Sequence, residues 1–311
     1  MKPMQTRKAN SLVSYLEIRT KITSVFPFLM ALAYLRLMDR PIDPLRTGIF
    51  FAGMLLFDLT ATAINNHADM RINPDLSSLS PGKAKGIILV LLALSMAFGL
   101  WLAALTDLVI LLAGALCFAF GILYSWGPLP LSHGPFGEAA SGFFYGVMIP
   151  YILIRINAPD YVIAYGLSAE QLSVQIQLVP AVGFLLLTVL PFCLTAAIML
   201  ANNICDAERD VRLGRHTLAF YLKEKALPLF AGLYYAAYAS VILMVAAGFL
   251  PSVSLLLLAT VIPVRRNIKA FMIKQDKKET FAVSIRNFLL ILPAHAGLIW
   301  IGSMIPSGRL L

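Results

Sequence analysis

The sequence predicts an all-α polytopic membrane protein: a bundle of nine transmembrane helices, built from two parallel four-helix repeats plus one helix. Three observations support this fold class. Of 311 residues, 59% are hydrophobic and 13% are charged, about half the charge of an ordinary soluble domain. Uncharged apolar stretches such as 86–105 recur along the chain and are long enough to cross a bilayer. A polar motif that begins at Asn65 recurs at Asn202.

Each predicted span is an apolar window of about the length that a membrane helix needs. In chain order the windows are 22–37, 45–66, 85–105, 107–124, 138–155, 177–201, 226–248, 250–265 and 286–304. Before them, 11–21 mixes apolar and charged residues and predicts an interfacial amphipathic helix. We expect a single domain over 1–311, with repeat halves at about 22–124 and 138–265.

The distribution of positive charge predicts the orientation. With the N-terminus inside, 20 of the 25 Lys and Arg residues lie in cytoplasmic segments, as the positive-inside rule requires. The five others are Arg36, Arg40, Arg46, Arg155 and Arg309. We therefore expect a multi-pass protein of the cell (plasma) membrane whose N-terminus and polar motifs face the cytoplasm. The net charge of +9 is then explained by basic residues at the cytoplasmic face of the lipid bilayer, and nucleic acid is not an expected partner.

The two polar motifs share the pattern NNxxDxxx(N/D) and cover 65–73 and 202–210. Four predicted spans separate them, so both copies face the same side, as in parallel membrane repeats that hold a site between their halves. Residues four apart share a helical face. The shared faces carry Asn65, Asp69 and Asn73 in the first motif, and Asn202, Asp206 and Asp210 in the second.

These residue types indicate a metal–diphosphate site. Clustered carboxylates repel one another unless a cation neutralises them, and a few hard oxygen ligands suit Mg²⁺ shared with substrate phosphates. Positive charge for an anion comes from Arg71, Lys83, Lys85, Arg209, Arg212 and Arg215. The alternative is that each motif is an ordinary juxtamembrane polar loop. Two copies of the motif at matching places in a repeat argue against this alternative.

With the predicted spans, the paired motifs resemble the UbiA superfamily of intramembrane prenyltransferases, whose Asp-rich motifs bind a prenyl diphosphate through Mg²⁺. Three segments are similar to the 1,4-dihydroxy-2-naphthoate polyprenyltransferase (MenA) branch: 15–21, Gly127–Pro130 with Gly137 and Glu138, and 214–219. The resemblance implies catalytic roles for Asp69, Asp206 and Asp210. It implies Mg²⁺ ligands among Asn65, Asn66, Asp69, Asn202, Asn203, Asp206 and Asp210.

The chain departs from the family pattern in its first motif. That motif commonly ends in Asp, whereas this chain has Asn73, and the usual Arg-Pro after it is absent. An amide binds Mg²⁺ more weakly than a carboxylate, so we expect Asp69 to be the main Mg²⁺ ligand of this motif.

Other residues are candidates for substrate binding. They are Arg19, Lys21, Asp58, Arg71, Lys83, Tyr124, Arg209 and Arg215. Asp58 lies inside a span, where a carboxylate is costly and often functional; it binds either an acceptor hydroxyl or a neighbouring helix. Arg19 and Lys21 bind an anionic substrate or lipid headgroups, and Tyr124 serves the site or an interfacial aromatic belt. The Lys-rich stretch 265–286 is expected to face anionic lipid.

The resemblance implies Mg²⁺-dependent transfer of a polyprenyl group from polyprenyl diphosphate to 1,4-dihydroxy-2-naphthoate, with decarboxylation, giving demethylmenaquinone. Within the same class, the aromatic acceptor could instead be 4-hydroxybenzoate or another compound. From a different class, the repeat fits a secondary transporter with polar sites at the membrane midplane. Here the Asp and Asn residues cluster at one membrane face, which favours the enzyme. Prenyl length and oligomeric state stay open.

Overall fold

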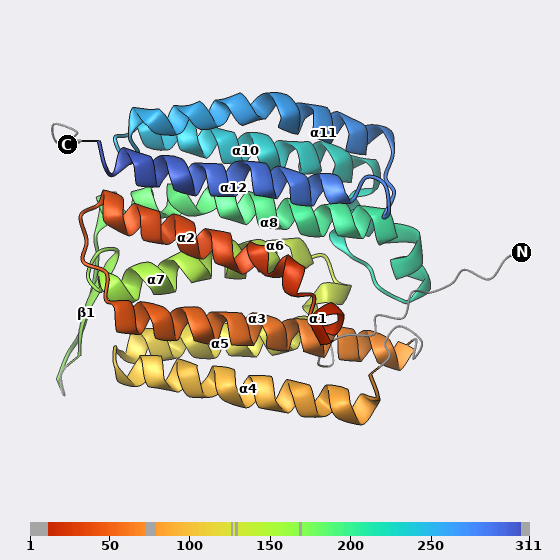
Figure 1. The fold of residues 1–311 in the computed structure, drawn as a ribbon, viewed down its shortest axis with the longest axis horizontal. Helices are drawn as coiled ribbons and strands as arrows, with labels where there is room; N and C mark the ends of the chain where they lie inside the picture. The colour runs from red at the N-terminus through yellow and green to blue at the C-terminus, as the bar shows by residue number, and fades with distance from the viewer. Residues whose placement is uncertain (1–11, 73–78, 126, 128–129, 168–169, 306–311) are drawn as a thin grey trace, which may run out of the picture. The chain divides into compact units, whose positions relative to one another are not determined.

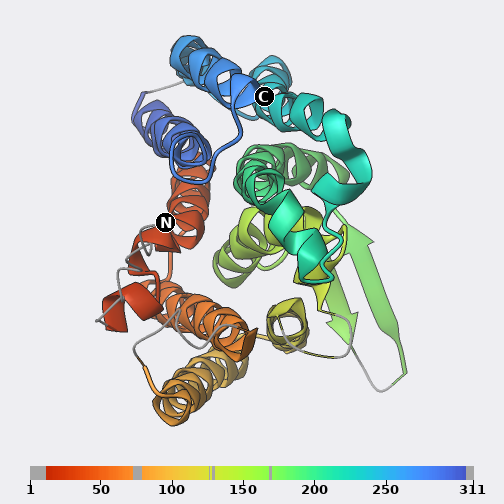
Figure 2. The same cartoon turned by 90° about the vertical axis from the view of Figure 1, so that its right-hand side faces the viewer.

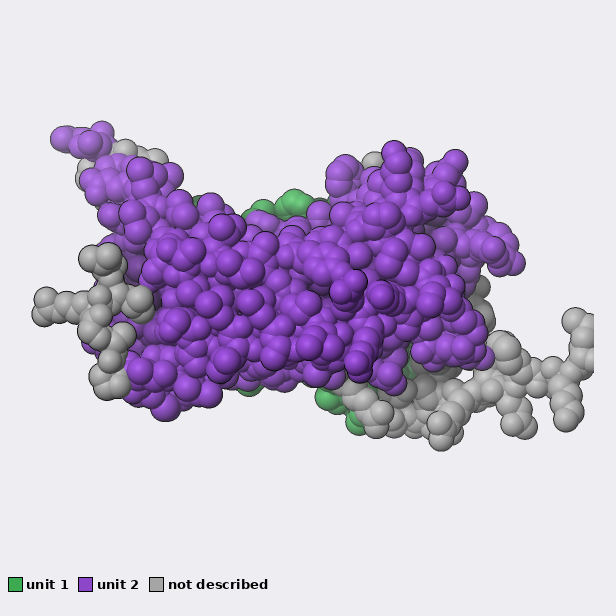
Figure 3. All heavy atoms as spheres, turned by 90° about the horizontal axis from the view of Figure 1, so that it is seen from above, with its two compact units in different colours: residues 1–24, 48–131 green, residues 25–47, 132–311 purple. Residues whose placement is uncertain are grey.

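The computed structural model describes residues 12–72, 79–125, 127, 130–167 and 170–305, and most of this chain is helical (Figure 1). The described chain forms two compact units, coloured separately in Figure 3. Unit 1 comprises residues 1–24 and 48–131, and unit 2 comprises 25–47 and 132–311. Two of the boundaries fall inside the first two long helices, and the third lies between residues 131 and 132.

Unit 1 contains the helices of the first motif. They are α1 (Leu12–Tyr15), the 3-10 helix η1 (Ile18–Lys21), most of α3 (Pro44–Ile72), α4 (Pro81–Ala104) and α5 (Leu108–Ser125). Phe57 of α3 stacks on Phe118 of α5, with ring centroids 4.2 Å apart. A small buried cluster joins α3 and α4 to the N-terminal segment through Tyr15, Leu16, Ala63, Met70 and Ala84.

Unit 2 contains the second motif and the remaining elements. They are α2 (Ile22–Leu37), η3 (Leu131–His133), α6 (Gly137–Phe143), the π-helical segment η4 (Phe144–Met148), α7 (Ile149–Asn157), β1 (Ile163–Leu167), β2 (Leu172–Ile176), α8 (Leu178–Arg212), α9 (Leu218–Leu222), η5 (Lys223–Lys225), α10 (Ala226–Ala246), the 3-10 segment η6 (Ser252–Thr260), α11 (Val261–Ile273) and α12 (Ala282–Gly302). Thus residues 65–72 of the first motif lie on α3 in unit 1, and the second motif lies on α8 in unit 2.

Helix α8 is the centre of unit 2 and packs against α6, α10 and α12 (Figure 2). Its side chains Leu187 and Leu194 are fully buried. Glycines on the facing segment permit the close approach: a Cβ added at Gly142 would lie 2.9 Å from the Phe192 carbonyl oxygen, and one at Gly146 would meet the Phe192 backbone. Small residues let membrane helices approach in this way. This contact fixes how α6 lies along α8. It therefore also fixes the position of Glu138, in the first turn of α6, relative to the second motif.

The prediction of a multi-span membrane protein is confirmed. Seven described helices are long and apolar enough to cross a bilayer: Pro44–Ala68, Pro81–Ala104, Leu108–Ser125, Gly137–Asn157, Leu178–Arg212, Leu218–Ala246 and Ala282–Gly302. The first predicted span corresponds to α2, which has only 16 residues. The predicted span 250–265 is divided between a 3-10 segment, Ser252–Thr260, and α11.

Two further segments differ from their sequence-based interpretation. The amphipathic helix expected at 11–21 is broken, because Glu17 is left-handed with a φ of 47° between α1 and η1. The connection after α7, for which no strands were expected, forms an antiparallel hairpin in which Tyr165 pairs with Val174. Its β2 sequence alternates apolar and polar residues, the period-two pattern of a strand. Strict alternation over this short stretch was the signal that could have predicted it.

Candidate functional site

The backbone of the first motif is described up to Ile72, and the side chains of its two asparagines contact neighbouring segments of unit 1. The Asn65 Oδ1 atom accepts a hydrogen bond of 3.2 Å from the Ser125 hydroxyl at the end of α5. Asn66 Nδ2 donates to the Tyr15 carbonyl at 2.7 Å and to Glu17 Oε1 at 3.3 Å. These bonds stabilise the left-handed break at Glu17. Four predicted contributors lie outside the described residues or have side chains that do: Arg19, Asp69, Arg71 and Asn73.

The Lys21 and Asp58 side chains meet in a buried ion pair within unit 1. Lys21 Nζ lies 2.9 Å from Asp58 Oδ1, and the ammonium also donates to the Asp58 carbonyl and to the Thr62 hydroxyl, at 3.1 and 2.5 Å. The Ser24 hydroxyl donates to the other Asp58 oxygen at 2.7 Å. Of the two roles that the sequence left open for Asp58, this network favours the contact with a neighbouring segment. The sequence listed both residues without predicting that they pair.

The two remaining candidates of unit 1 are Lys83 and Tyr124. Lys83 is exposed in the first turn of α4, where its backbone N–H faces the Ser80 hydroxyl that caps the helix, at 3.5 Å. Tyr124 is half-buried in the last turn of α5, next to Ser125. Tyr124 is thus within one residue of the partner of Asn65, at the same end of unit 1 as the first motif.

The second motif is fully described and lies on the last turns of α8. Asn203 and Asp210 are buried, while Asn202 and Asp206 are half-buried. Asn203 Nδ2 donates a 2.9 Å hydrogen bond to Oε1 of Glu138, which is buried in the first turn of α6. The other Glu138 oxygen is buried and has no hydrogen-bond partner among the described residues. Asn203 is therefore bound to α6, whereas Asn202 and Asp206 contact a different segment of the chain, the connection between α11 and α12.

Lys277 is a contact of this motif that the sequence did not single out. It lies in the connection between α11 and α12, and its Nζ is 2.6 Å from Asp206 Oδ2. The same ammonium donates to Asn202 Oδ1. In Figure 1 this connection lies beside the C-terminal part of α8. The sequence offered several lysines in this stretch and no signal that distinguished one of them.

Further positive charge surrounds Asp210. Arg215, Arg209 and Lys277 all lie near enough to attract its carboxylate. Arg209 is exposed and Arg215 is half-buried. The chain reverses here because Gly214 is left-handed, with a φ of 74°, and the Arg215 N–H bonds the Asp210 carbonyl at 2.8 Å. Glycine in this position is the common end of a helix. The turn returns Arg215 to the end of α8 on which Asp210 lies.

The oxygen atoms of the second motif suit a hard divalent cation. Two carboxylates, Asp206 and Asp210, lie one turn apart on α8 together with two asparagine amides. Among the residues that the structure describes, no three His, Cys, Asp or Glu side chains form a metal cluster. Mg²⁺ does not require one, since it is typically held by one or two carboxylates plus substrate phosphates. The donor set therefore fits Mg²⁺ bound together with a phosphate-bearing substrate.

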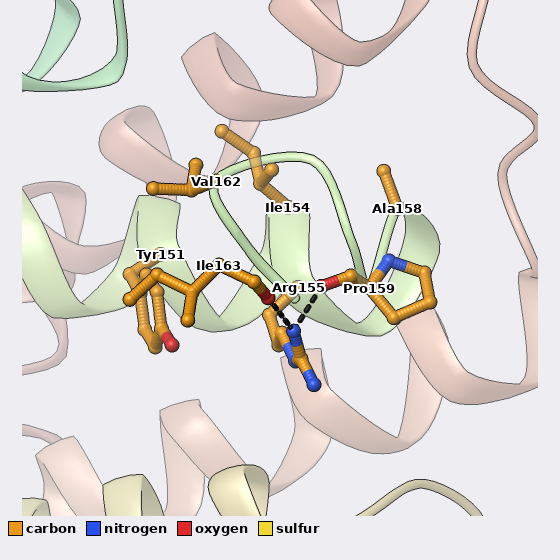
Figure 4. Close-up of a pocket in the computed structure, with 7 residues that line it drawn as sticks. All are labelled: Tyr151, Ile154, Arg155, Ala158, Pro159, Val162 and Ile163. Carbon is orange, nitrogen blue, oxygen red and sulfur yellow. Dashed lines mark hydrogen bonds between the residues drawn. The ribbon is translucent and has the colours of Figure 1, made fainter. Parts of the chain in front are cut away.

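A small cavity lies far from this motif, where α7 ends and β1 begins (Figure 4). The buried Arg155 side chain donates to the carbonyls of Pro159 and Ile163. Arg155 thus satisfies carbonyls at the end of α7. Along α8, which begins at Leu178, 24 residues precede the second motif at Asn202, a distance of about 36 Å at 1.5 Å per residue. This cavity is structural and does not belong to the candidate site.

Comparison with known proteins gives three findings on relatedness. The sequence matches the UbiA prenyltransferase family over residues 24–291. The 1,4-dihydroxy-2-naphthoate octaprenyltransferase of Bacillus subtilis (strain 168) is 31% identical over 170 residues, which are 53% of this chain and 49% of that protein. The match thus spans about half the length of that curated relative.

Solved structures share the fold. A UbiA homologue from Aeropyrum pernix K1 has a TM-score of 0.63 at 19% identity, covering 87% of this chain and 96% of that one. A UbiA homologue from Archaeoglobus fulgidus, bound to DMAPP and Mg²⁺, has a TM-score of 0.57 at 15% identity, covering 92% and 98%.

Proposed function

We propose, because the chain belongs to the UbiA prenyltransferase family, that this membrane protein transfers a polyprenyl group from polyprenyl diphosphate to an aromatic acceptor, and that the acceptor is 1,4-dihydroxy-2-naphthoate. The observation that carries the first part is the carboxylate–amide face of α8, flanked by Arg209 and Arg215. The similarity to the Bacillus subtilis octaprenyltransferase supports the choice of acceptor and the product, demethylmenaquinone, which the transfer yields as its hydroquinone because no oxidant takes part.

The donor site is assigned as follows. Asp206 and Asp210 bind Mg²⁺ with help from the Asn202 and Asn203 amides, and Arg209 and Arg215 bind the diphosphate. The sequence repeat assigns the same metal-binding role to Asn65, Asn66 and Asp69, with Arg71 and Lys83 as further anion contacts. When bound, Mg²⁺ neutralises the charge of the leaving diphosphate and so favours its departure.

The reaction breaks the bond between the allylic carbon and the diphosphate oxygen, and the diphosphate leaves with the electron pair. A new carbon–carbon bond forms to the electron-rich ring of the acceptor, which loses its carboxylate as CO₂. The protein must exclude water from the reacting carbon, and the apolar spans that surround α8 provide an environment for this. Tyr124 and Arg19 are assigned to the acceptor or diphosphate by sequence alone.

For the membrane topology we propose nine crossings in a single domain, with parallel repeats and both motifs cytoplasmic. In this assignment α2 and the segment η6–α11 cross the bilayer in addition to the seven long apolar helices. The assignment follows from the positive-inside count and places the protein in the plasma membrane. In each of the helices α3 and α8, the described motif residues lie in the last turns and not in the middle of the helix, which also favours the enzyme over a transporter with midplane sites.

The test is prenyl transfer by purified protein in detergent. Radiolabelled polyprenyl diphosphate is offered with 1,4-dihydroxy-2-naphthoate, 4-hydroxybenzoate or no acceptor, with and without EDTA. We expect labelled product with the naphthoate and its loss in EDTA, restored by added Mg²⁺. Product with 4-hydroxybenzoate instead would change the acceptor. No product with any acceptor, from protein that keeps its helical fold, would overturn the enzyme assignment, because a transporter alone gives no transfer in detergent.

A further inference from the structure

The connection between α11 and α12, residues 274–281, is a built turn. Asp276 Oδ1 accepts hydrogen bonds from the backbone N–H groups of Lys278 and Glu279, at 2.8 and 2.9 Å. The Thr280 hydroxyl accepts from the Asp276 N–H at 2.9 Å and donates to the Lys274 carbonyl, also at 2.9 Å. Hydrogen bonds to the charged form of a carboxylate favour that form, and here they hold the pKa of Asp276 below its usual value.

This turn presents Lys277 to the second motif. Its Nζ is 2.6 Å from Asp206 Oδ2 and also donates to Asn202 Oδ1. The ammonium lies 4.7 Å from the centre of the Phe281 ring, a cation–π distance. Two residues of the proposed donor site and one aromatic ring therefore position a single ammonium group, although the lysine side chain is 41% exposed.

Stability is a weak reason for such an arrangement. An ion pair exposed to this degree contributes little to stability, and holding a lysine side chain in one position costs rotamer entropy. Asp206 and Asn202 are also residues to which the donor site assigns Mg²⁺. A metal on this carboxylate repels the ammonium, whereas a diphosphate beside it offers several anionic oxygens. Lys277 has three N–H donors for them.

We propose that the turn 274–281 belongs to the diphosphate site and that Lys277 is a substrate-contact residue. In this proposal the Lys277 ammonium pairs with Asp206 until substrate enters, and then donates to a diphosphate oxygen while Asp206 binds the metal. The exchange moves no proton and breaks no covalent bond. It deepens the function proposed above and rests on it. Lys277 then serves both as counter-ion of Asp206 and as ligand of the substrate.

The test compares Lys277→Gln with Lys278→Gln in the full-length protein. Lys278 is the matched control because it is the adjacent exposed lysine and contributes its backbone N–H, which the substitution keeps, to the turn. Binding of inorganic diphosphate with Mg²⁺ is measured by calorimetry, and binding of Mn²⁺ without diphosphate by electron paramagnetic resonance. We expect Lys277→Gln to weaken diphosphate binding about tenfold or more, as for a lost charge-assisted hydrogen bond, and Lys278→Gln to change it less than twofold.

The metal titration separates substrate contact from a structural role. Removing a cation beside Asp206 leaves Mn²⁺ affinity equal or higher in Lys277→Gln, whereas a collapsed turn lowers both affinities and overturns the proposal. Lys277→Arg, which keeps the charge, is expected to restore part of the diphosphate affinity. Unchanged diphosphate binding in Lys277→Gln, with wild-type binding intact, overturns this inference and leaves the proposed function standing. Failure of the wild-type protein itself to bind Mg²⁺–diphosphate overturns both.

Discussion

The Asn203 amide lies against the carboxylate of Glu138, with Nδ2 2.9 Å from Oε1. Both side chains are buried, at 7% and 3% exposure. This bond links the first turn of α6 to the second motif of α8. It also orients Asn203, since an amide that donates to Glu138 has its Oδ1 atom turned away from that carboxylate. Glu138, which the sequence marks only as part of a segment similar to the MenA branch, is thus a positioning residue for Asn203.

Replacing Glu138 tests this link. In Glu138→Ala the Asn203 amide loses its partner in a buried place, which costs about 1–3 kcal/mol. We expect a lower melting temperature in detergent and a weaker Mg²⁺ titration. Glu138→Gln keeps an acceptor oxygen for Asn203 and is expected to restore most of both. Equal damage in the two variants would show that the charge of Glu138, and not its hydrogen bond, is what the site requires.

The buried pair of Lys21 and Asp58 gives a second prediction. Lys21→Met leaves the Asp58 carboxylate without its cation, and breaking one half of a buried pair costs about 3–5 kcal/mol. The double variant Lys21→Met/Asp58→Leu removes both charges and is expected to recover much of that stability in thermal unfolding. Because the pair is a contact between segments, we expect the folded double variant to keep the KM for the aromatic acceptor. A KM raised tenfold would instead assign Asp58 to the acceptor hydroxyl.

The second motif predicts that prenyl transfer depends on the negative charge of its two aspartates, which Asp→Asn substitutions remove while nearly preserving side-chain volume. Asp206→Asn and Asp210→Asn each remove a carboxylate from the proposed metal site, so we expect most prenyl transfer to be lost with the fold intact. The control is Glu208→Gln, an exposed carboxylate on the same helix, which is expected to stay near wild-type activity. Initial rates over a Mg²⁺ series measure the effect. Wild-type rates in Asp206→Asn protein would remove the metal assignment.

The first motif predicts that Asp69 contributes more to prenyl transfer than Asn73 does. Asp69 is its one carboxylate within a turn of Asn65 and Asn66, so Asp69→Ala is expected to abolish most activity. Asn73 offers only a neutral amide, and Asn73→Ala is expected to cost about tenfold or less, roughly 1.4 kcal/mol of transition-state stabilisation. Both are assayed at saturating Mg²⁺ and donor. An equal loss of prenyl-transfer activity in Asp69→Ala and Asn73→Ala would contradict the larger role assigned to Asp69.

Cys205 reports the orientation of the chain. It lies within the second motif and is half-exposed, whereas Cys193 of the same helix is buried. If the motif is cytoplasmic, an impermeant thiol reagent is expected to label Cys205 in inside-out vesicles and not in intact cells. The Cys205→Ser variant measures background labelling of the other thiols. Labelling of Cys205 from outside intact cells would invert the topology.

Features that depend on composition and local spacing can be deduced from the sequence of this protein. A charge content of 13% and long apolar windows indicate a membrane protein, because charge is costly in hydrocarbon. The four-residue spacing of Asp206 and Asp210 places them on one face of a helix, and the structure has them on α8. Such properties involve residues near one another in the chain, so they can be deduced without tertiary packing.

Which residues pair across long stretches of sequence follows from the packing of the helices. Lys277 meets Asp206 across 71 residues of sequence, and Asn203 meets Glu138 across 65. No local pattern distinguishes Lys277 from Lys278, because only the Asp276 turn and the packing of α12 against α8 select one ammonium. The break at Glu17 depends likewise on Asn66, 49 residues away. Helix periodicity sets which face a side chain occupies, but the partner on that face is set by how the helices pack.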